Sequence, residues 1–233
     1  MCNLVLLEDK RKGADNMIER GILFDDIHSF YDLNLILAPF VPSPATPKTT
    51  YVDIAGADGS LDLTEVHGEV RYKDRDHTFT FTINPSEKMT FDEKVTEVSN
   101  ALNGKKCKIT LDRDSDYYWE GRCVVNKYAQ DRRLGQISVK ATVRPYKLKQ
   151  EETVVSIALT SEEQEVVFTN GRKAVVPEIT CTDDNTLVKF GSFETRLSAG
   201  THHVLDVYFK EGENTLILSG SGTITIKYRE GEL

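Results

Sequence analysis

Residues 77–83 read HTFTFTI, and this stretch decides the fold class of the chain. Phe79, Phe81 and Ile83 alternate with threonines, which is the two-residue period of a half-buried β-strand of aromatic and β-branched side chains. The run ISVKATV repeats this period and places four apolar residues on one face: Ile137, Val139, Ala141 and Val143. The sequence therefore predicts a mainly β protein.

One amphipathic helix interrupts the predicted strands. Its apolar residues recur at spacings of four, three and four and form a single stripe: Phe91, Val95, Val98 and Leu102. Thr90 and Glu93 form a capping box at the start, and Asn103-Gly104 supplies the stop because glycine adopts the left-handed conformation readily. We expect the stripe to lie across a sheet; the alternative is a groove that binds a partner.

The second half of the chain is almost purely β. Turn signals recur about every ten residues between its apolar runs, one of which is HVLDVYF (203–209), and this cadence is typical of a small antiparallel sandwich or jelly roll. The polar connector KLKQEE follows Pro145, so we place a domain boundary there and expect domains of residues 1–145 and 146–233. The proline-rich stretch 38–48 predicts an exposed extended arm or loop rather than a linker.

Composition and charge exclude several classes of function. The chain has 233 residues, 39% of them apolar, and its 37 acidic and 29 basic side chains give a net charge of -8. Such a chain has no general electrostatic attraction to nucleic acid or anionic lipid. No apolar run approaches the roughly 18 residues that a membrane span needs, and residues 1–17 do not read as a secretory signal. We expect a soluble, non-secreted protein.

Cysteines and histidines give no metal site. The four cysteines contain no CxxC pair: Cys2, Cys107, Cys123 and Cys181. Cys107 and Cys123 are equidistant from Ser115, so a hairpin centred there would place them opposite each other, either as a disulfide or, as we favour, as two inward-facing apolar residues. His202 and His203 are neighbours in a strand pattern and should point to opposite faces, which disfavours a shared metal ion.

The acidic clusters also lack a clear chemistry. Aligning Gly59 with the glycine of a calcium loop puts apolar residues at the first ligand positions, so a solvated turn explains these acids better: Asp53, Asp58, Asp62 and Glu65. We expect the hairpin-tip acids Asp112, Asp114 and Asp116 to be solvated too. The aromatic run 117–119 is either a sugar-stacking platform or, as we favour, part of a sheet core. The sequence predicts no catalytic, cofactor-binding or metal-ligating residue and no enzyme activity.

The ordered series of segments resembles the distal tail proteins of bacteriophages with long, non-contractile tails and of related prophages. The most recognisable segment is TTYVDIAGADGSLDLTE (49–65), an extended stretch with an Asp-Gly turn. Seven further segments match in order along nearly the whole chain: ILFDDIHSFYDLNLIL (22–37), VRYKDRDHTFTF (70–81), ALNGKKCKITLD (101–112), YYWEGRCVV (117–125), VRPYKL (143–148), FTNGRKAVVPEIT (168–180) and EGENTLILSGSGTITIKYREG (211–231).

The resemblance implies a structural role at the tail tip of a virion assembled in the bacterial cytoplasm. It implies a β-sandwich-like N-terminal domain that forms a ring, generally a hexamer, around a channel through which DNA only passes. It also implies a C-terminal galectin-like β-sandwich, with the tail tube protein and a tail-associated protein or adhesion device as partners. The alternative is a carbohydrate-binding module for host cell-wall glycans, which the absence of tryptophan from the C-terminal half disfavours because Trp119 is the only one.

Overall fold

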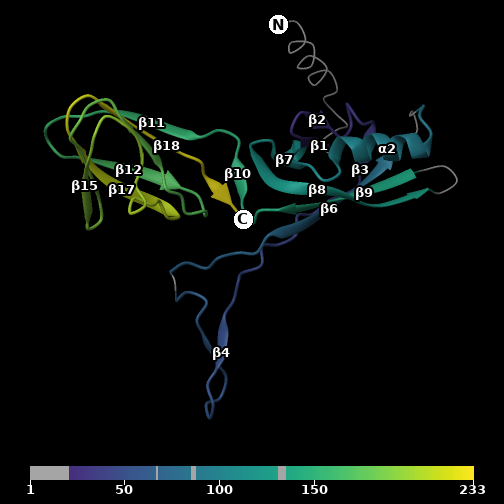
Figure 1. The fold of residues 1–233 in the computed structure, drawn as a ribbon, viewed down its shortest axis with the longest axis horizontal. Coiled ribbons are helices and arrows are strands. Elements are labelled where there is room, and N and C mark those ends of the chain that lie inside the picture. The colour runs from purple at the N-terminus through teal and green to yellow at the C-terminus, as the bar shows by residue number, and fades with distance from the viewer. Residues whose placement is uncertain (1–20, 67, 85–87, 131–134) are drawn as a thin grey trace, which may run out of the picture. The chain divides into compact units, whose positions relative to one another are not determined.

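The computed structural model describes residues 21–66, 68–84, 88–130 and 135–233 (Figure 1). Residues 1–17, for which the sequence predicts no secretory signal, lie outside the described residues, and so does Cys2. The chain divides into two compact units, of which the first ends at Pro145 and the second begins at Tyr146. Both units consist mainly of antiparallel strands, so the prediction of a mainly β protein is confirmed.

The first unit is built on one antiparallel sheet with the strand order β2-β1-β7-β8-β9-β6-β3. The strands are β1 (Ile22–Phe24), β2 (Ile27–His28), β3 (Leu35–Leu37), β6 (Arg75–Ile83), β7 (Lys106–Leu111), β8 (Tyr117–Gln130) and β9 (Gly135–Val143). The predicted alternation is confirmed, because Phe79 pairs with Val139 across β6 and β9 and both side chains are fully buried. The threonine between the two phenylalanines of β6, Thr80, faces the opposite side and contacts Ser138.

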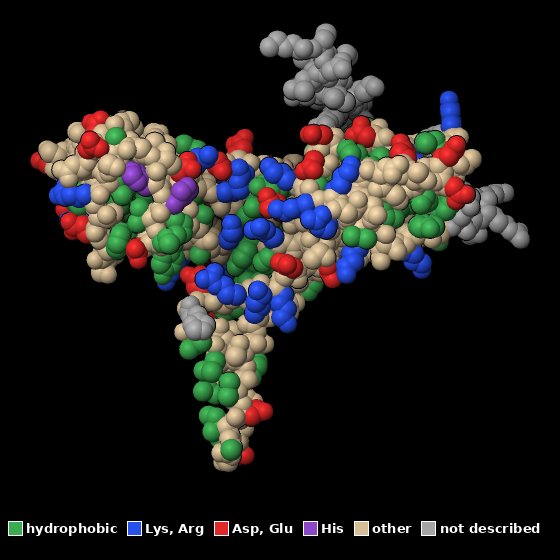
Figure 2. Space-filling view, in the orientation of Figure 1, with side chains coloured by type: hydrophobic (Ala, Val, Ile, Leu, Met, Phe, Trp, Pro, Cys, Tyr) green, Lys and Arg blue, Asp and Glu red, His purple; other side chains and the backbone are tan. Residues whose placement is uncertain are grey.

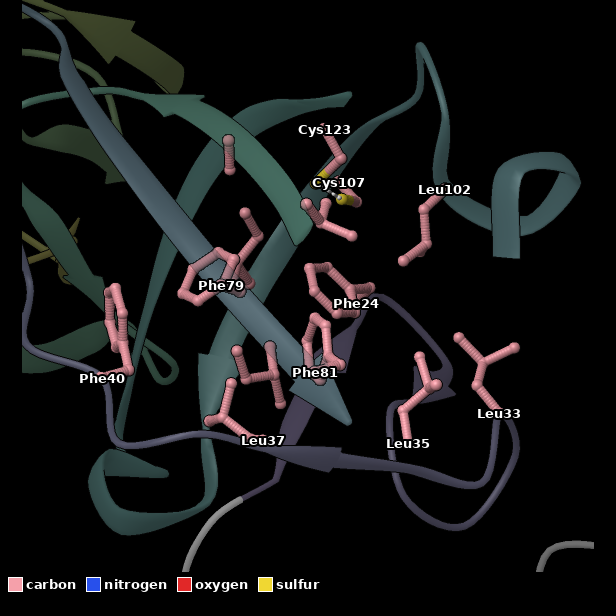
Figure 3. Close-up of a cluster of buried hydrophobic side chains, with 14 of the residues drawn as sticks. Phe24, Leu33, Leu35, Leu37, Phe40, Phe79, Phe81, Leu102, Cys107 and Cys123 are labelled. Carbon is pink, nitrogen blue, oxygen red and sulfur yellow. Dashed lines mark hydrogen bonds between the residues drawn. The ribbon is translucent and has the colours of Figure 1, made fainter. Parts of the chain in front are cut away.

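This sheet curls so that β1 lies over β6. Strands β1 and β6 are separated by three others, and in a flat sheet they would lie about 19 Å apart. Instead the ring centroid of Phe24 lies 6.1 Å from that of Phe79 and 6.4 Å from that of Phe81. Figure 3 shows these rings pointing toward one another inside the curled sheet. The inward faces thus enclose a single core in the manner of a sandwich.

Helix α2 (Phe91–Leu102) covers part of that core. The capping box is present, because the Thr90 side chain accepts from the backbone of Glu93 while the Glu93 carboxylate accepts from the Thr90 backbone N–H at 2.9 Å. Val98 and Leu102 are buried in the same cluster as the sheet residues, which confirms that the apolar stripe lies across a sheet. No helix among the described residues has the length and apolar character needed to span a membrane.

The second unit is a sandwich of two antiparallel sheets, as predicted. One sheet has the order β11-β18-β13-β16 and the other has the order β12-β17-β14-β15. The strands are β11 (Thr153–Ala158), β12 (Gln164–Asn170), β13 (Glu178–Cys181), β14 (Thr186–Phe190), β15 (Phe193–Leu197), β16 (Gly200–His203), β17 (Gly212–Ser219) and β18 (Thr223–Tyr228). A short pair, β10 (Lys147–Lys149) and β19 (Gly231–Glu232), joins the two ends of this unit.

One predicted strand of this unit is wrong. The run HVLDVYF (203–209) turns at Leu205, where the backbone N–H of Val207 donates to the carbonyl of Val204 at 3.0 Å. Val207 and Phe209 are nevertheless fully buried, while Leu205 is 78% exposed. The apolar alternation therefore anchors a loop on the core, and only His203, the last residue of β16, lies in a strand.

Candidate assembly surface

A narrow projection, called the arm here, leaves the sheet of the first unit and ends in a hairpin (Figure 1). It begins and ends at Pro47 and Tyr72, which pair at its base. Its hairpin is the separate two-stranded sheet of β4 (Tyr51–Asp53) and β5 (Ser60–Asp62). Every residue from 47 to 62 is exposed to solvent.

Backbone and short polar side chains determine the shape of the arm. The Leu63 N–H donates to the carbonyl of Thr50 at 2.8 Å, and the Ser60 hydroxyl donates to the carboxylate of Asp53 at 2.5 Å. Gly59 adopts a φ of +76°, which the predicted Asp-Gly turn requires and which glycine tolerates best. Asp62 accepts the backbone N–H of Thr64 at 2.9 Å, and hydrogen bonds from Thr64 lower the pKa of this carboxyl.

The arm exposes large apolar side chains along much of its length. Figure 2 shows hydrophobic side chains along one edge of the arm and carboxylates toward its tip. Five large apolar residues are more than two-fifths exposed: Tyr51, Val52, Ile54, Leu61 and Val66. An isolated two-stranded hairpin is only marginally stable in water, and an apolar surface of this kind marks an interaction site. The arm therefore has the character of a segment that docks on another surface.

The arm differs in charge from the rest of its unit. Residues 49–70 carry five carboxylates and no lysine or arginine. The remainder of residues 1–145 carries 20 basic and 18 acidic side chains, so the acidity of the first half is concentrated in the arm. Exposed cations lie at the base of the arm and just beyond it, at Lys48, Arg71 and Lys73.

The outer side of β7, β8 and β9 carries the opposite charge. This basic face consists of five cationic residues that follow the outward positions of the strands: Lys106, Lys108, Arg122, Lys140 and Arg144. Glu120 is a counter-charge, 3.6 Å from the Lys106 ammonium and 3.7 Å from the Arg144 guanidinium. Asp76 is a second one, and its hydrogen bond from Lys140 at 2.9 Å lowers the pKa of its carboxyl. Val124, 45% exposed, lies beside Lys140 within this face.

The acids and aromatics that sequence analysis singled out have other roles. The described residues bring together no group of three or more histidine, cysteine, aspartate or glutamate side chains that could hold a metal ion. Asp112 is an exception to the predicted solvated acids, because it accepts from the backbone of Gly21 at 2.9 Å and contacts the buried His28 imidazole at 3.1 Å. Tyr118 and Trp119 are each 3% exposed, so the sugar-stacking interpretation is wrong and the core interpretation is right.

The cysteine pair lies on the inward face but not in direct opposition. Cys107 pairs with Gly121, which makes Cys123 its diagonal neighbour and corrects the predicted register. The cause is the turn, because the 3₁₀-helix Asp112–Asp114 moves the centre of the hairpin toward the N-terminus. Both cysteines are free and buried in the core cluster, as the favoured interpretation predicted.

The second unit has an open cleft of about 560 Å³ that sequence reasoning did not find. Aromatic and polar side chains line it, including Phe190, Phe193, Asp206, Tyr208 and Glu213. The ring of Tyr208 lies 6.3 Å from that of Phe190, and the Lys210 ammonium lies 5.3 Å from the centre of the Tyr208 ring. These residues come from a turn, a loop and a strand end, so no single run of sequence could have revealed the cleft.

Known proteins provide two informative matches. Residues 27–171 match the model of a family described as the phage tail protein RIFT-related domain. The crystal structure of the Dit protein (gp 19.1) of SPP1, described as a paradigm of the hub adsorption apparatus in phages that infect Gram-positive bacteria, has a TM-score of 0.67. It is 13% identical, and the alignment covers 91% of this chain and 99% of that chain, which shows a shared fold. No curated protein matches the chain.

Proposed function

Because this chain belongs to the phage tail protein RIFT-related domain family, we propose that it forms a ring at the distal end of a long, non-contractile tail. In this role six copies surround the channel and join the tail tube protein to a tail-associated protein or adhesion device in the virion, after assembly in the host cytoplasm. The observation that carries the proposal is the arm, an exposed apolar hairpin that needs a second surface. The fold shared with the SPP1 hub protein supports it.

The contact that repeats around the ring joins the arm of one copy to the basic face of the next. The arm offers carboxylates and apolar side chains such as Val52 and Leu61, while the basic face offers five cations around Val124. Burial of the apolar side chains supplies affinity, and charge complementarity fixes the orientation and speeds the encounter. Two different surfaces meet in such a contact, so repetition closes a ring when the rotation divides a full turn.

Native mass measurement of the full chain tests the ring. Six copies of the 26.3 kDa chain would have a mass of about 158 kDa. We expect this species for the wild type and monomers for the double variant Val52→Asp with Leu61→Asp, because the new charges oppose burial of the arm. Val167→Asp is the matched control, since Val167 is 53% exposed on β12 of the second unit. A wild type that stays monomeric at every concentration, with and without its tube protein, would overturn the proposal.

The ring is a passage for DNA and has no catalytic role in this proposal. A chain of net charge -8 has little affinity for a polyanion, so DNA can move through the channel without being held. We expect no measurable binding of duplex DNA by the assembled protein at about 0.15 M salt. Tight binding under these conditions would contradict free passage, although it would leave the ring itself intact.

A second candidate function is recognition of cell-wall glycans by the second unit, and the cleft beside Tyr208 favours it. Its aromatic rings beside Asp206 and Glu213 resemble the mixed lining that sugars require. The test is binding of the full chain to a cell-wall glycan array, with Tyr208→Ala to remove the exposed ring and Val167→Asp as the control. Binding by the wild type and the control but not by Tyr208→Ala would establish this function. No binding by the wild type would exclude it.

A further inference from the structure

Two thiols in the core of the first unit lie close enough to react with each other. The Sγ atoms of Cys107 in β7 and Cys123 in β8 are 3.4 Å apart, and Figure 3 shows them facing one another on the inner side of the sheet. A disulfide bond has a length near 2.05 Å, so closure needs an approach of about 1.4 Å.

The two thiols differ in access and in acidity. Cys107 is 7% exposed at the start of β7, whereas Cys123 is fully buried. The hydrogen bond from Cys123 lowers the pKa of the Cys107 thiol despite its burial and the nearby Asp25 carboxylate, and the same hydrogen bond raises the pKa of Cys123. Thiolate is the reactive form of cysteine. Cys107 is therefore the thiol that reacts first, and Cys123 is the thiol behind it.

We propose that Cys107 and Cys123 form an oxidation site, which a peroxide converts into a disulfide between β7 and β8. The Cys107 thiolate attacks one oxygen of hydrogen peroxide and breaks the O–O bond, which leaves a sulfenic acid and hydroxide. The sulfur of Cys123 then attacks the Cys107 sulfur, and the sulfenic oxygen leaves as water with the Cys123 proton. Two thiols lose two electrons in total, and one peroxide is reduced to water. This inference does not depend on the ring.

The bond would fasten the base of a long hairpin. Cys107 and Cys123 are 16 positions apart, and the turn of the β7–β8 hairpin lies between them. Cross-linking a loop of about this length stabilises a fold by restricting the unfolded chain. In a protein of this size we expect the melting temperature of the first unit to rise by about 5–10 °C on oxidation. Trp119 reports this transition selectively, because it is the only tryptophan and lies in the core of the first unit.

The test uses the full chain with Cys2→Ser and Cys181→Ser, which leaves Cys107 and Cys123 as its only thiols. The folded protein is treated with hydrogen peroxide, quenched, unfolded and labelled with iodoacetamide. We expect two labels before oxidation and none after it, with a mass lower by two hydrogen atoms. A tryptic digest should join residues 107–108 to residues 123–127, and a reductant should separate them. The wild-type digest gives the same readout should the double variant not fold.

A third substitution in this background provides the matched control. With Cys107→Ser the remaining thiol has no partner, so peroxide should produce neither the cross-link nor the rise in melting temperature. Three results would overturn the proposal. Both thiols of the folded protein could still take the label after peroxide treatment, the cross-link could form only in denaturant, or the cross-linked protein could melt at the temperature of the reduced one.

Discussion

The strand β6 and the arm of the same unit have similar patterns of apolar residues, but these side chains are buried in β6 and exposed on the arm. In β6 the alternate residues Phe79 and Phe81 are fully buried, whereas on the arm Val52 and Leu61 face solvent although they too lie on paired strands. The difference is the second layer, because the curled sheet brings β1 over β6 and nothing in the described chain covers the hairpin of the arm. The local apolar pattern determines that each segment forms a strand. A covering layer then determines whether the apolar side chains of that strand are buried or stay available for a partner.

The largest expected effect comes from removing a ring of the covered strand. Phe79→Ala should lower the free energy of unfolding of the first unit by about 3–5 kcal/mol, because it leaves a cavity among aromatic neighbours. Leu61→Ala on the arm should change the stability of the monomer by less than about 0.5 kcal/mol. Urea unfolding followed by Trp119 fluorescence measures both. A comparable loss for Leu61→Ala would mean that the arm is already covered in the monomer, and the contrast would fail.

The buried histidine of β6 should make the covered region sensitive to acid. His77 is fully buried, and burial lowers its pKa from 6.5 to about 4. Below pH 6.5 the unfolded chain binds a proton that the folded chain does not bind until about pH 4, so stability falls as the pH decreases through this window. The loss should reach about 2 kcal/mol at pH 5 and about 3 kcal/mol below pH 4.

The variant His77→Gln isolates this effect, since glutamine does not titrate. As the pH falls from 7 to 5, the unfolding free energy of the wild type should therefore decrease more than that of His77→Gln. Equal pH slopes for the wild type and His77→Gln would refute the lowered pKa.

A smaller effect is expected at the start of α2, between the covered core and solvent. Thr90→Ala removes the acceptor for the Glu93 N–H and half of the capping box, and it should cost about 1 kcal/mol. Thr96 is the matched control, because its hydroxyl donates to the carbonyl of Asp92 inside the same helix and Thr96→Ala should be neutral or slightly stabilising. Equal losses at both positions, measured by urea unfolding, would show that the cap itself contributes nothing specific.

The elements that sequence analysis predicted well are those determined by neighbours along the chain. The helix from Phe91 to Leu102 was predictable because its period and caps are local, and β6 was predictable because its alternation is regular. The contact between His28 and Asp112 was not, since 84 positions separate the two residues. Nor was the exposure of the arm, because alternation shows which residues share a face and does not show what covers that face.

The predicted strand at 203–209 failed for a related reason. Its buried positions, Val207 and Phe209, keep the period of a strand, yet the chain turns at Leu205, and beyond this turn the run pairs only through the bridge between Phe209 and Val175. Burial of alternate side chains is thus compatible with a loop held on a core. The cleft beside Tyr208 arises at this same loop, so the error in the strand and the missed cleft have one cause.

The smallest expected effect concerns the charge of the arm rather than its apolar side chains. Asp58→Asn removes one carboxylate at the exposed tip, and an exposed ion pair contributes about 0.2–1 kcal/mol. The concentration for half-maximal ring formation should therefore rise roughly 1.5- to 5-fold at low salt. Above about 1 M salt the shift should disappear, because screening then acts within about 3 Å. Sedimentation or native mass measurement across a concentration series gives both values.

The control for this prediction is Glu165→Gln, which removes an equally exposed carboxylate from β12 of the second unit. If only net charge mattered, both variants would assemble more readily than the wild type, because each reduces the repulsion between acidic chains. If the acidic arm meets the basic face, Asp58→Asn weakens the ring, whereas Glu165→Gln leaves the ring equally or slightly more stable. Shifts of the same sign would place the contact of the arm elsewhere, and a shift that persists at high salt would assign the Asp58 contribution to something other than charge.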